Sequence, residues 1–300
     1  MKKVLVIAGV TGVGKSNLGI ELAKRYNGEI ISGDSVAVYK ELTIGSAKMR
    51  DHEMEGIVHH GIDLLALNQT FNVRDFQSYA RGKIDEITEK GKLPIVVGGS
   101  GLYIRALLYD YVFVDEQPAD MSWAESLSNE EIHELLRKKD SQQAEIIHTN
   151  NRKRLLRALS IFHSTQQSKT ELLSQQKHQM IFDAKIVACT MPRELLYQRL
   201  NQRVENMIEN GLLDEVRAAA NIAGWDHPAM LAIGYKEFRN YFDGSITLED
   251  AISLVQRNTR RFAKRQITWF KHQLPCRWLD MSDLHDVNQT ISEVKEWMSR

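Results

Sequence analysis

Cysteine is scarce in this chain of 300 residues, which contains only Cys189 and Cys276. The two lie far apart in the sequence, so we expect neither a disulfide framework nor a cysteine-based zinc site. The histidines form no H-E-x-x-H motif, and no hydrophobic run is long enough to span a membrane. We therefore expect a cytoplasmic protein that does not bind a membrane.

A net charge of either sign is also absent, because 39 Lys and Arg residues balance 39 Asp and Glu residues. Such a protein has no general attraction for nucleic acid, so any nucleic-acid surface must be a local basic patch. The sequence contains no internal repeat, no low-complexity tract and no Gly/Ser-rich linker. A string of independent domains on flexible linkers is therefore not expected.

Strand and helix patterns alternate over residues 1–109, where KVLVIAG, EIISGD and LPIVVGG read as buried strands. Beyond about residue 110 helical patterns predominate, and DAKIVACT (183–190) is one further apolar strand. Alternation of this kind is typical of a parallel α/β sheet. We predict a P-loop NTPase-like parallel sheet flanked by helices, formed by residues 1–109 and about 183–300. A mostly helical insertion would occupy residues from about 110 to 182.

The segment GVTGVGKS, residues 9–16, fits the phosphate-binding pattern G-x-x-x-x-G-K-[ST]. It lies between a predicted strand and a predicted helix, where backbone N–H groups and the helix dipole attract phosphate. Lys15 would reach the terminal phosphates, and the Ser16 hydroxyl could bind Mg²⁺. The motif predicts a diphosphate or triphosphate site, but it does not distinguish kinases, ATPases, GTPases and group transferases.

Two further polar residues follow predicted parallel strands. Asp34 could hold Mg²⁺ or act as a general base, although an aspartate there also forms Asx turns. Ser100 follows IVVGG and offers a hydroxyl at the same sheet edge, unless this glycine-rich segment is a plain tight turn. An ATPase would usually carry a second Mg²⁺-positioning acid at such a strand end, and IVVGG has none.

One arginine and two basic segments are candidates for binding an anion. Arg203 borders the apolar stripe of a helix predicted over RELLYQRLNQRVENMIENG, where it could bind an anion or simply extend into solvent. NRKRLLRAL and QRNTRRFAKRQITWFK contain no acidic residue, and the second contains three aromatic residues. Both could be solvated helix faces, but they also suit contact with a phosphate backbone. Arg260 and Arg261 are our candidates for that contact in the second segment.

Taken together, these motifs closely resemble those of the tRNA dimethylallyltransferases, also called tRNA isopentenyltransferases. The matching segments follow the family's order along nearly the whole chain, and the last of them is long and distinctive. They are GVTGVGKS, SGDSVAVYKELTIGSAK, HHGIDL, FNVRDFQ, PIVVGGSGLYIRALL, NRKRLLRAL, RVENMIENGLLDEVR, AIGYKEF and RNTRRFAKRQITWF. No zinc-finger segment follows, as in the shorter bacterial form.

The family transfers a dimethylallyl group from dimethylallyl diphosphate to N6 of the adenosine on the 3′ side of the tRNA anticodon. The resemblance implies that Asp34 takes the amine proton, Ser100 hydrogen-bonds the leaving oxygen and Arg203 stabilises the departing diphosphate. It also implies that Mg²⁺ binds at Ser16 and that the helical insertion binds the anticodon stem-loop. We expect the protein to be a monomer. The implied diphosphate-binding residues are Gly9, Thr11, Gly12, Val13, Gly14, Lys15 and Ser16. The implied tRNA-binding residues are Asp34, Ser35, Val36, Ala37, Lys153, Arg154, Leu155, Leu156 and Arg157.

Five residues depart from the family's usual pattern. Val10 replaces proline, Val36 and Ala37 replace methionine and glutamine, Lys40 replaces arginine, and Leu231 replaces glutamine. The change at Ala37 removes an amide that could read the adenine edge. Three alternatives therefore stay open: an isopentenyltransferase that acts on free adenine nucleotides, a P-loop small-molecule kinase, and a tRNA-binding relative with weak catalytic activity.

Overall fold

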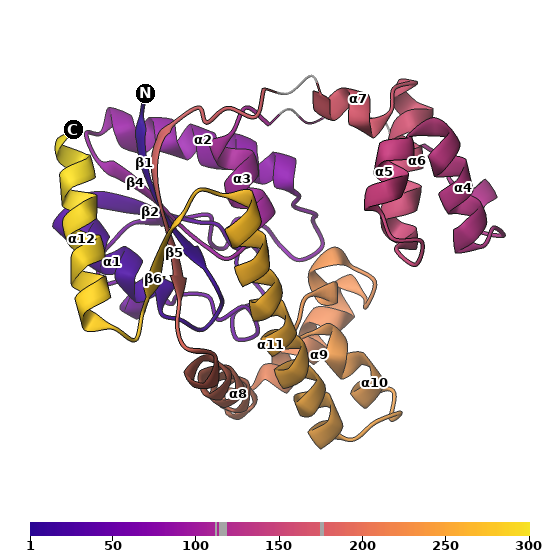
Figure 1. The fold of residues 1–300 in the computed structure, drawn as a ribbon. Helices are drawn as coiled ribbons and strands as arrows, with labels where there is room; N and C mark the ends of the chain where they lie inside the picture. Colours follow the sequence, from indigo (N-terminus) through magenta and orange to yellow (C-terminus); the bar gives the residue numbers. More distant parts are fainter. Residues whose placement is uncertain (112, 114–118, 175–176) are drawn as a thin grey trace. The chain divides into compact units, whose positions relative to one another are not determined.

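The computed structural model describes residues 1–111, 113, 119–174 and 177–300 (Figure 1). The chain divides into two compact units, one formed by Met1–Tyr109 with Met180–Arg300 and the other by Asp110–Gln179. Of the insertion expected from the sequence, residues 112, 114–118 and 175–176 lie outside the described residues. Residues 180–182 belong to the first unit.

The first unit is built on a six-stranded sheet with the strand order β3-β2-β4-β1-β5-β6, in which every neighbouring pair is parallel. In chain order the strands are β1 (Lys3–Gly9), β2 (Gly28–Ser32), β3 (His59–His60), β4 (Leu93–Val97), β5 (Asp183–Thr190) and β6 (Arg277–Asp280). Because β5 pairs with β1, the chain returns to the middle of the sheet after the second unit. The parallel sheet predicted from the sequence is confirmed.

Helices cover both faces of this sheet (Figure 1). Alternate side chains of a strand point to opposite faces, and in β1 both sets are apolar. Leu5 and Ile7 pack in a core with α1 and α12, whereas Val4 and Val6 pack in a second core with α2 and α3. The helices of this unit are α1 (Lys15–Arg25), α2 (Val73–Glu89), α3 (Gly101–Leu108), α8 (Arg193–Glu209), α9 (Leu212–Ala223), α10 (Arg239–Phe242), α11 (Leu248–Gln273) and α12 (Leu284–Ser299).

A third apolar core supports the segment that follows β2. Tyr39 and Leu42 from that segment pack with residues of α9, of the 3-10 helix η4 (Lys236–Phe238) and of the first half of α11. Tyr39 and Leu42 are at most 2% exposed, so the segment is fixed although it has little regular structure. Two further 3-10 helices of this unit are η1 (Asp51–Glu53) and η3 (Pro228–Leu231).

The second unit is helical and has a small core of its own, which includes Ile132, Leu136, Leu155 and Leu159. A capping box begins its first long helix: the Ser128 hydroxyl accepts a hydrogen bond from the N–H of Glu131, and the Glu131 side chain accepts one from the N–H of Ser128. Its elements are η2 (Ser122–Ala124), α4 (Asn129–Lys139), α5 (Ser141–Ile146), α6 (Arg152–Thr165) and α7 (Lys169–Ser174). In neither unit does a described helix combine the length and apolar character that crossing a membrane requires.

The last residue of β1 approaches β5 so closely that it has no room for a side chain. A Cβ atom on Gly9 would lie 2.2 Å from the carbonyl oxygen of Cys189, and the φ angle of Gly9 is +123°. We expect Gly9→Ala to reduce the free energy of unfolding by at least about 3 kcal/mol, because backbone strain and overpacking act together. Urea unfolding followed by circular dichroism measures this change.

Gly82 provides the matched control for this substitution. It lies on the exposed side of α2, and a Cβ atom added there would have no heavy atom within 4 Å. Gly82→Ala should stabilise the protein by about 0.5–1 kcal/mol, since alanine favours a helix interior. Equal urea midpoints for the two variants would contradict the close approach of β1 and β5.

Candidate functional site

A cavity of about 710 Å³ opens in the first unit beyond the carboxyl ends of β1, β2 and β4. This edge is where open parallel sheets usually bind their ligands. The phosphate-binding loop, the segment after β2 and the turn after β4 form part of the wall, and side chains of α8 and α11 complete it. Lys15, Ser16, Asp34, Ser100 and Arg203 all line this one cavity.

The phosphate-binding loop joins β1 to α1 as its sequence predicts, with Gly14 in the left-handed conformation at the N-cap of α1. In the described part of the chain no group accepts a hydrogen bond from the N–H of Gly12 or of the four residues after it. These N–H groups and the α1 N-terminus make a cradle for an anion. The N–H of Thr11 is not part of it, because it donates to Oε1 of Gln266 at 3.1 Å, although Thr11 still lines the cavity. Val13 is 1% exposed, so only its backbone can take part.

The ammonium group of Lys15 lies over the loop and donates a hydrogen bond to the carbonyl oxygen of Val10 at 2.6 Å. Burial lowers its pKa to about 8, and the positive charge of Arg203 adds to this effect. The charge on Asp34 acts in the opposite direction. A cation with a lowered pKa gains from the arrival of an anion, which is the environment expected for a phosphate-binding lysine.

Asp34 both shapes its own turn and faces the cavity. Its Oδ1 accepts hydrogen bonds from the N–H groups of Val36 at 2.8 Å and Ala37 at 3.3 Å, which is the Asx turn that the sequence left open. Its charge raises the pKa of both Lys15 and Arg203, although burial keeps the pKa of Arg203 below its usual value. The turn therefore orients the carboxylate without removing it from the cavity.

Ser100 and Arg203 reach the cavity from opposite halves of the sequence. Ser100 occupies the N-cap of α3, and its hydroxyl makes no capping hydrogen bond there. Arg203 is half-buried on α8. Because the Ser100 hydroxyl makes no capping hydrogen bond, it is available to a ligand. A guanidinium that is partly shielded from water binds anions strongly.

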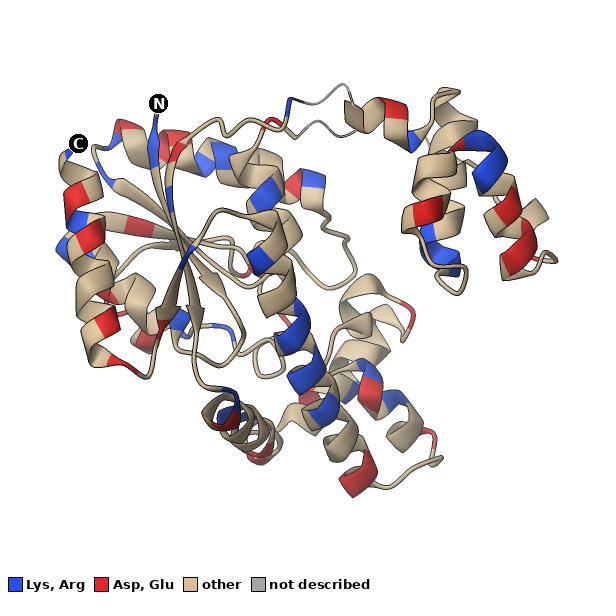
Figure 2. Ribbon diagram, viewed as in Figure 1, with Lys and Arg blue, Asp and Glu red and all other residues tan. Residues whose placement is uncertain are grey.

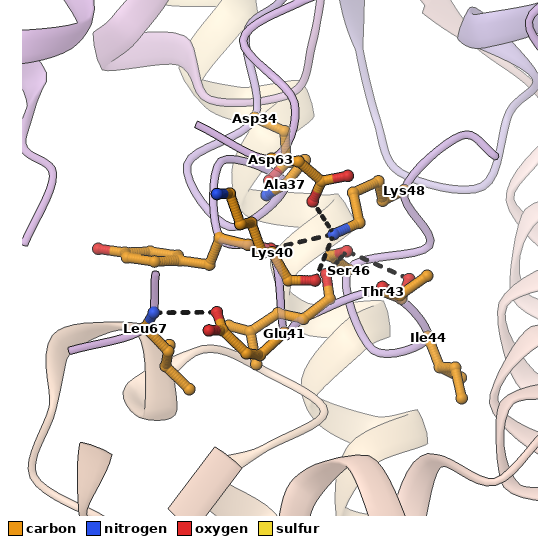
Figure 3. A network of polar contacts seen from close by, with 12 residues as sticks. Asp34, Ala37, Lys40, Glu41, Thr43, Ile44, Ser46, Lys48, Asp63 and Leu67 are labelled. Carbon is orange, nitrogen blue, oxygen red and sulfur yellow. Dashed lines mark hydrogen bonds and ion pairs between the residues drawn. The ribbon is translucent and has the colours of Figure 1, made fainter. Parts of the chain in front are cut away.

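Sequence reasoning missed the residues that hold the segment after β2 in place. The carboxylate of Glu215 accepts hydrogen bonds from the N–H groups of Thr43, Ile44 and Gly45 at 2.7–2.9 Å. Lys48 is 8% exposed and donates to the carbonyl oxygens of Tyr39 at 3.0 Å and Lys40 at 3.2 Å, and it pairs with Asp63 (Figure 3). Nothing in the local pattern signals these roles. Glu215 lies 170 to 172 positions from its partners, and the partners of Lys48, 8 to 15 positions away, follow no helix or strand spacing.

The basic stretch of α11 is visible as a band of Lys and Arg along the helix (Figure 2). Arg261 is exposed, whereas Arg260 is half-buried and donates to Oδ1 of Asn201 at 2.6 Å. Of the three aromatic residues in this stretch, Phe262 lines the cavity and Phe270 is fully buried in the core. The helix thus presents cations to solvent along one side and completes the cavity wall with another.

In the second unit, α6 carries the basic residues expected to contact tRNA. Lys153, Arg154 and Arg157 are exposed, and Leu156 is half-buried. Leu155 is fully buried in the core of the unit, so its side chain is not available for a partner. An open recess lies beside this face of α6. The residues that line it are Met121, Asn151, Lys153, Arg154, Leu156, Arg157 and Ser160.

The departures from the family's pattern have different surroundings. Val10 is fully buried and its N–H donates to the carbonyl oxygen of Cys189 at 3.3 Å, a bond that a proline could not make. Ala37 is 5% exposed and lines the cavity, as does the half-exposed Leu231. Lys40 is exposed. Val10 therefore fits its place well, and the altered surface of the cavity lies at Val36, Ala37 and Leu231.

A metal-binding cluster is not preformed: the described residues contain no group of three or more His, Cys, Asp or Glu residues that could hold an ion. Mg²⁺ differs from zinc in this respect, because it commonly takes one or two protein ligands together with substrate phosphates and water. The Ser16 hydroxyl lines the cavity beside the anion cradle and suits that type of coordination.

Comparisons with known proteins show which family the chain belongs to. A family model described as IPP transferase matches residues 37–273. A tRNA dimethylallyltransferase of Anoxybacillus flavithermus is 46% identical over 299 residues, which cover 99% of this chain and 96% of that protein. The tRNA δ(2)-isopentenylpyrophosphate transferase of Staphylococcus epidermidis has a similar crystal structure, with a TM-score of 0.74, 37% identity and coverage of 100% of this chain and 99% of that one. A eukaryotic dimethylallyltransferase that acts on tRNA gives a TM-score of 0.88 at 32% identity and covers 100% and 80% of the two chains. These matches confirm the resemblance found in the sequence, and the chain belongs to the IPP transferase family.

Proposed function

We propose that this protein is a transferase that moves a dimethylallyl group from dimethylallyl diphosphate to N6 of the adenosine on the 3′ side of the tRNA anticodon. The observation that carries the proposal is the single cavity in which an anion cradle, Lys15, Asp34, Ser100 and Arg203 come together. Family membership supports the same reaction. We propose a monomeric enzyme.

Each group has a distinct part in this reaction. The free N–H groups of the loop and Lys15 bind the diphosphate, and the carboxylate of Asp34 accepts the proton of the adenine amine. The bond between the allylic carbon and oxygen breaks as the bond from N6 to that carbon forms, and the electron pair leaves with the diphosphate. Ser100 donates a hydrogen bond to the leaving oxygen, and Arg203 stabilises its charge. Positioning and charge neutralisation thus provide most of the catalysis.

A divalent cation suits this arrangement, and we propose Mg²⁺. Ser16 would hold it together with diphosphate oxygens, as in other phosphate-binding loops. When bound, the ion would neutralise part of the charge that develops on the diphosphate. The protein side chains alone provide the base and the hydrogen-bond donor, so their tasks do not depend on how the ion is coordinated.

The tRNA is proposed to contact two basic surfaces. One consists of exposed residues of α11, including Arg261, and the other is the α6 face with Lys153, Arg154 and Arg157. Ser35, Val36 and Ala37 would contact the adenosine itself, since they follow Asp34 at the cavity wall. The adenine would have to leave its stack to reach the cavity, at a cost of about a few kcal/mol.

Incubation with radiolabelled dimethylallyl diphosphate, Mg²⁺ and either unmodified tRNA or AMP tests the proposal. We expect label on tRNA, and no label on tRNA in which that adenosine is replaced by guanosine. Label on AMP would instead indicate a transferase for free nucleotides. Phosphoryl transfer from ATP would indicate a kinase, and salt-sensitive tRNA binding without transfer would indicate a binding protein.

Loss of charge on α11 should weaken tRNA binding without affecting the diphosphate site. We expect the double variant Arg261→Gln and Lys264→Gln to bind tRNA more weakly and to flatten its salt dependence by about one to two units of slope. Fluorescence anisotropy at several salt concentrations measures both quantities. Arg25→Gln with Lys24→Gln on α1 is the matched control, since both residues are exposed there. Equal salt slopes for the two double variants would remove α11 from the proposed interface.

A further inference from the structure

The turn that carries Ser100 is held by the last part of α11. A Cβ atom on Gly99 would lie 2.4 Å from Nε2 of Gln266, and one on Gly101 would lie 2.2 Å from the ring of Trp269. Glycine is therefore needed on both sides of Ser100, because two side chains of α11 occupy the space. This close packing fixes the backbone of the turn against the helix.

Gln266 also holds the phosphate-binding loop. It is 5% exposed, and both ends of its amide are used. Its Oε1 accepts a hydrogen bond from the N–H of Thr11 at 3.1 Å, and its Nε2 donates to the carbonyl oxygen of Gly99 at 2.9 Å. One buried side chain thus bridges the loop after β1 and the turn after β4, which come from adjacent strands.

We propose that Gln266 is a positioning residue for the transfer reaction: it sets the separation between the anion cradle and the Ser100 hydroxyl. This inference rests on the proposed function. In that reaction the cradle holds the diphosphate while Ser100 meets the oxygen that leaves the allylic carbon. The two must therefore keep a fixed distance as the bond breaks, and an error of about 1 Å can reduce a rate by about 100-fold.

The side-chain amide of Gln266 suits this positioning role because it can accept one hydrogen bond and donate another. Thr11 offers a donor and Gly99 offers an acceptor, so the bridging group must accept at one end and donate at the other. A carboxylate could satisfy only Thr11, and an apolar side chain could satisfy neither. By occupying the N–H of Thr11, Gln266 also sets where the cradle begins, which leaves the N–H groups from Gly12 onward for the diphosphate.

Two substitutions test the inference. Gln266→Met keeps the length of the side chain and loses both hydrogen bonds, whereas Gln266→Glu keeps the bond to Thr11 and loses the donor to Gly99. We expect kcat for transfer to tRNA to fall at least about ten-fold in each variant. KM for dimethylallyl diphosphate should change less than about three-fold in Gln266→Met, because Lys15 and the free N–H groups still bind the anion. Gln289→Met, at an exposed position of α12, is the matched control and should retain wild-type kcat.

The outcomes separate this inference from the proposed function. If the wild-type protein transfers no label to tRNA, the proposed function fails. If the wild type is active and a folded Gln266→Met variant keeps kcat within two-fold, the positioning role is wrong. A rise in KM alone would also overturn it, since Gln266 would then serve ground-state binding. If Gln266→Met does not fold, Gln266→Glu decides by the same criterion, because it preserves the shape and one of the bonds.

Discussion

Replacing Asp34 with asparagine should reduce the rate of prenyl transfer by about 10²–10⁴-fold, the usual contribution of a general base. Asparagine keeps the side-chain oxygen that accepts the N–H groups of Val36 and Ala37, so the Asx turn should survive. It cannot accept the amine proton, so the variant separates the proposed chemical role of Asp34 from its structural one. Single-turnover transfer with saturating tRNA and dimethylallyl diphosphate measures the rate.

The assay for this variant is best run near pH 7. The charge of Asp34 raises the pKa of Lys15, so its loss should lower that pKa further and weaken diphosphate binding at higher pH. Asp51→Asn makes the same chemical change at an exposed position in η1 and should leave the rate unchanged. Normal turnover by a folded Asp34→Asn protein would show that another group takes the proton.

Lys15→Met should weaken the binding of dimethylallyl diphosphate by about 10–100-fold, because a hydrogen bond to a charged group contributes about 1.5–3 kcal/mol. Isothermal titration calorimetry without tRNA measures this affinity.

The same substitution should also change how the affinity for dimethylallyl diphosphate depends on pH. Burial lowers the pKa of Lys15 to about 8, so above that pH the ammonium of the empty site loses its proton. Diphosphate binding must then restore the proton, and wild-type affinity should fall by up to about ten-fold per pH unit.

The Lys15→Met variant should show no such decline between about pH 8 and 9.5. Lys24→Met is the matched control, because Lys24 lies on the same helix but is exposed. It should retain both the affinity of the wild type and its decline above pH 8. A decline that persists in Lys15→Met would assign the titration to a different group.

The parts of the fold that the sequence predicts are those with strong local signals. β1 and β4 contain continuous apolar runs, each followed by a glycine-rich segment, and β5 contains the shorter apolar run IVAC. β3 has two residues and β6 includes Arg277 and Asp280, so neither shows the pattern of a buried strand. α12 is also absent from the prediction, although its apolar residues recur at helical spacing and were within reach of the same reasoning.

The residues of the candidate site also fall into those that the sequence indicates and those that only the structure reveals. The glycine loop predicts an anion cradle by itself, and the family resemblance points to Asp34, Ser100 and Arg203, which the structure brings to one cavity. The residues that support the site from other parts of the chain cannot be predicted from local sequence patterns. Gln266 meets Thr11 across 255 positions and Glu215 meets Thr43 across 172 positions, so their roles exist only once the sheet is assembled. The sequence around a helical glutamine or glutamate does not indicate a hydrogen-bond partner that lies far away in the chain.

The position of β1 in the sheet has a consequence for biosynthesis. This strand is made first, yet one of its two neighbours, β5, emerges from the ribosome only after the whole second unit has been translated. Until then a long apolar strand keeps one edge unpaired, which favours aggregation of nascent or truncated chains. The contact of Gly9 with the Cys189 carbonyl forms with that pairing, and the bridge made by Gln266 forms later still. The proposed diphosphate site is therefore completed late in synthesis, and fragments that end before β5 should be insoluble.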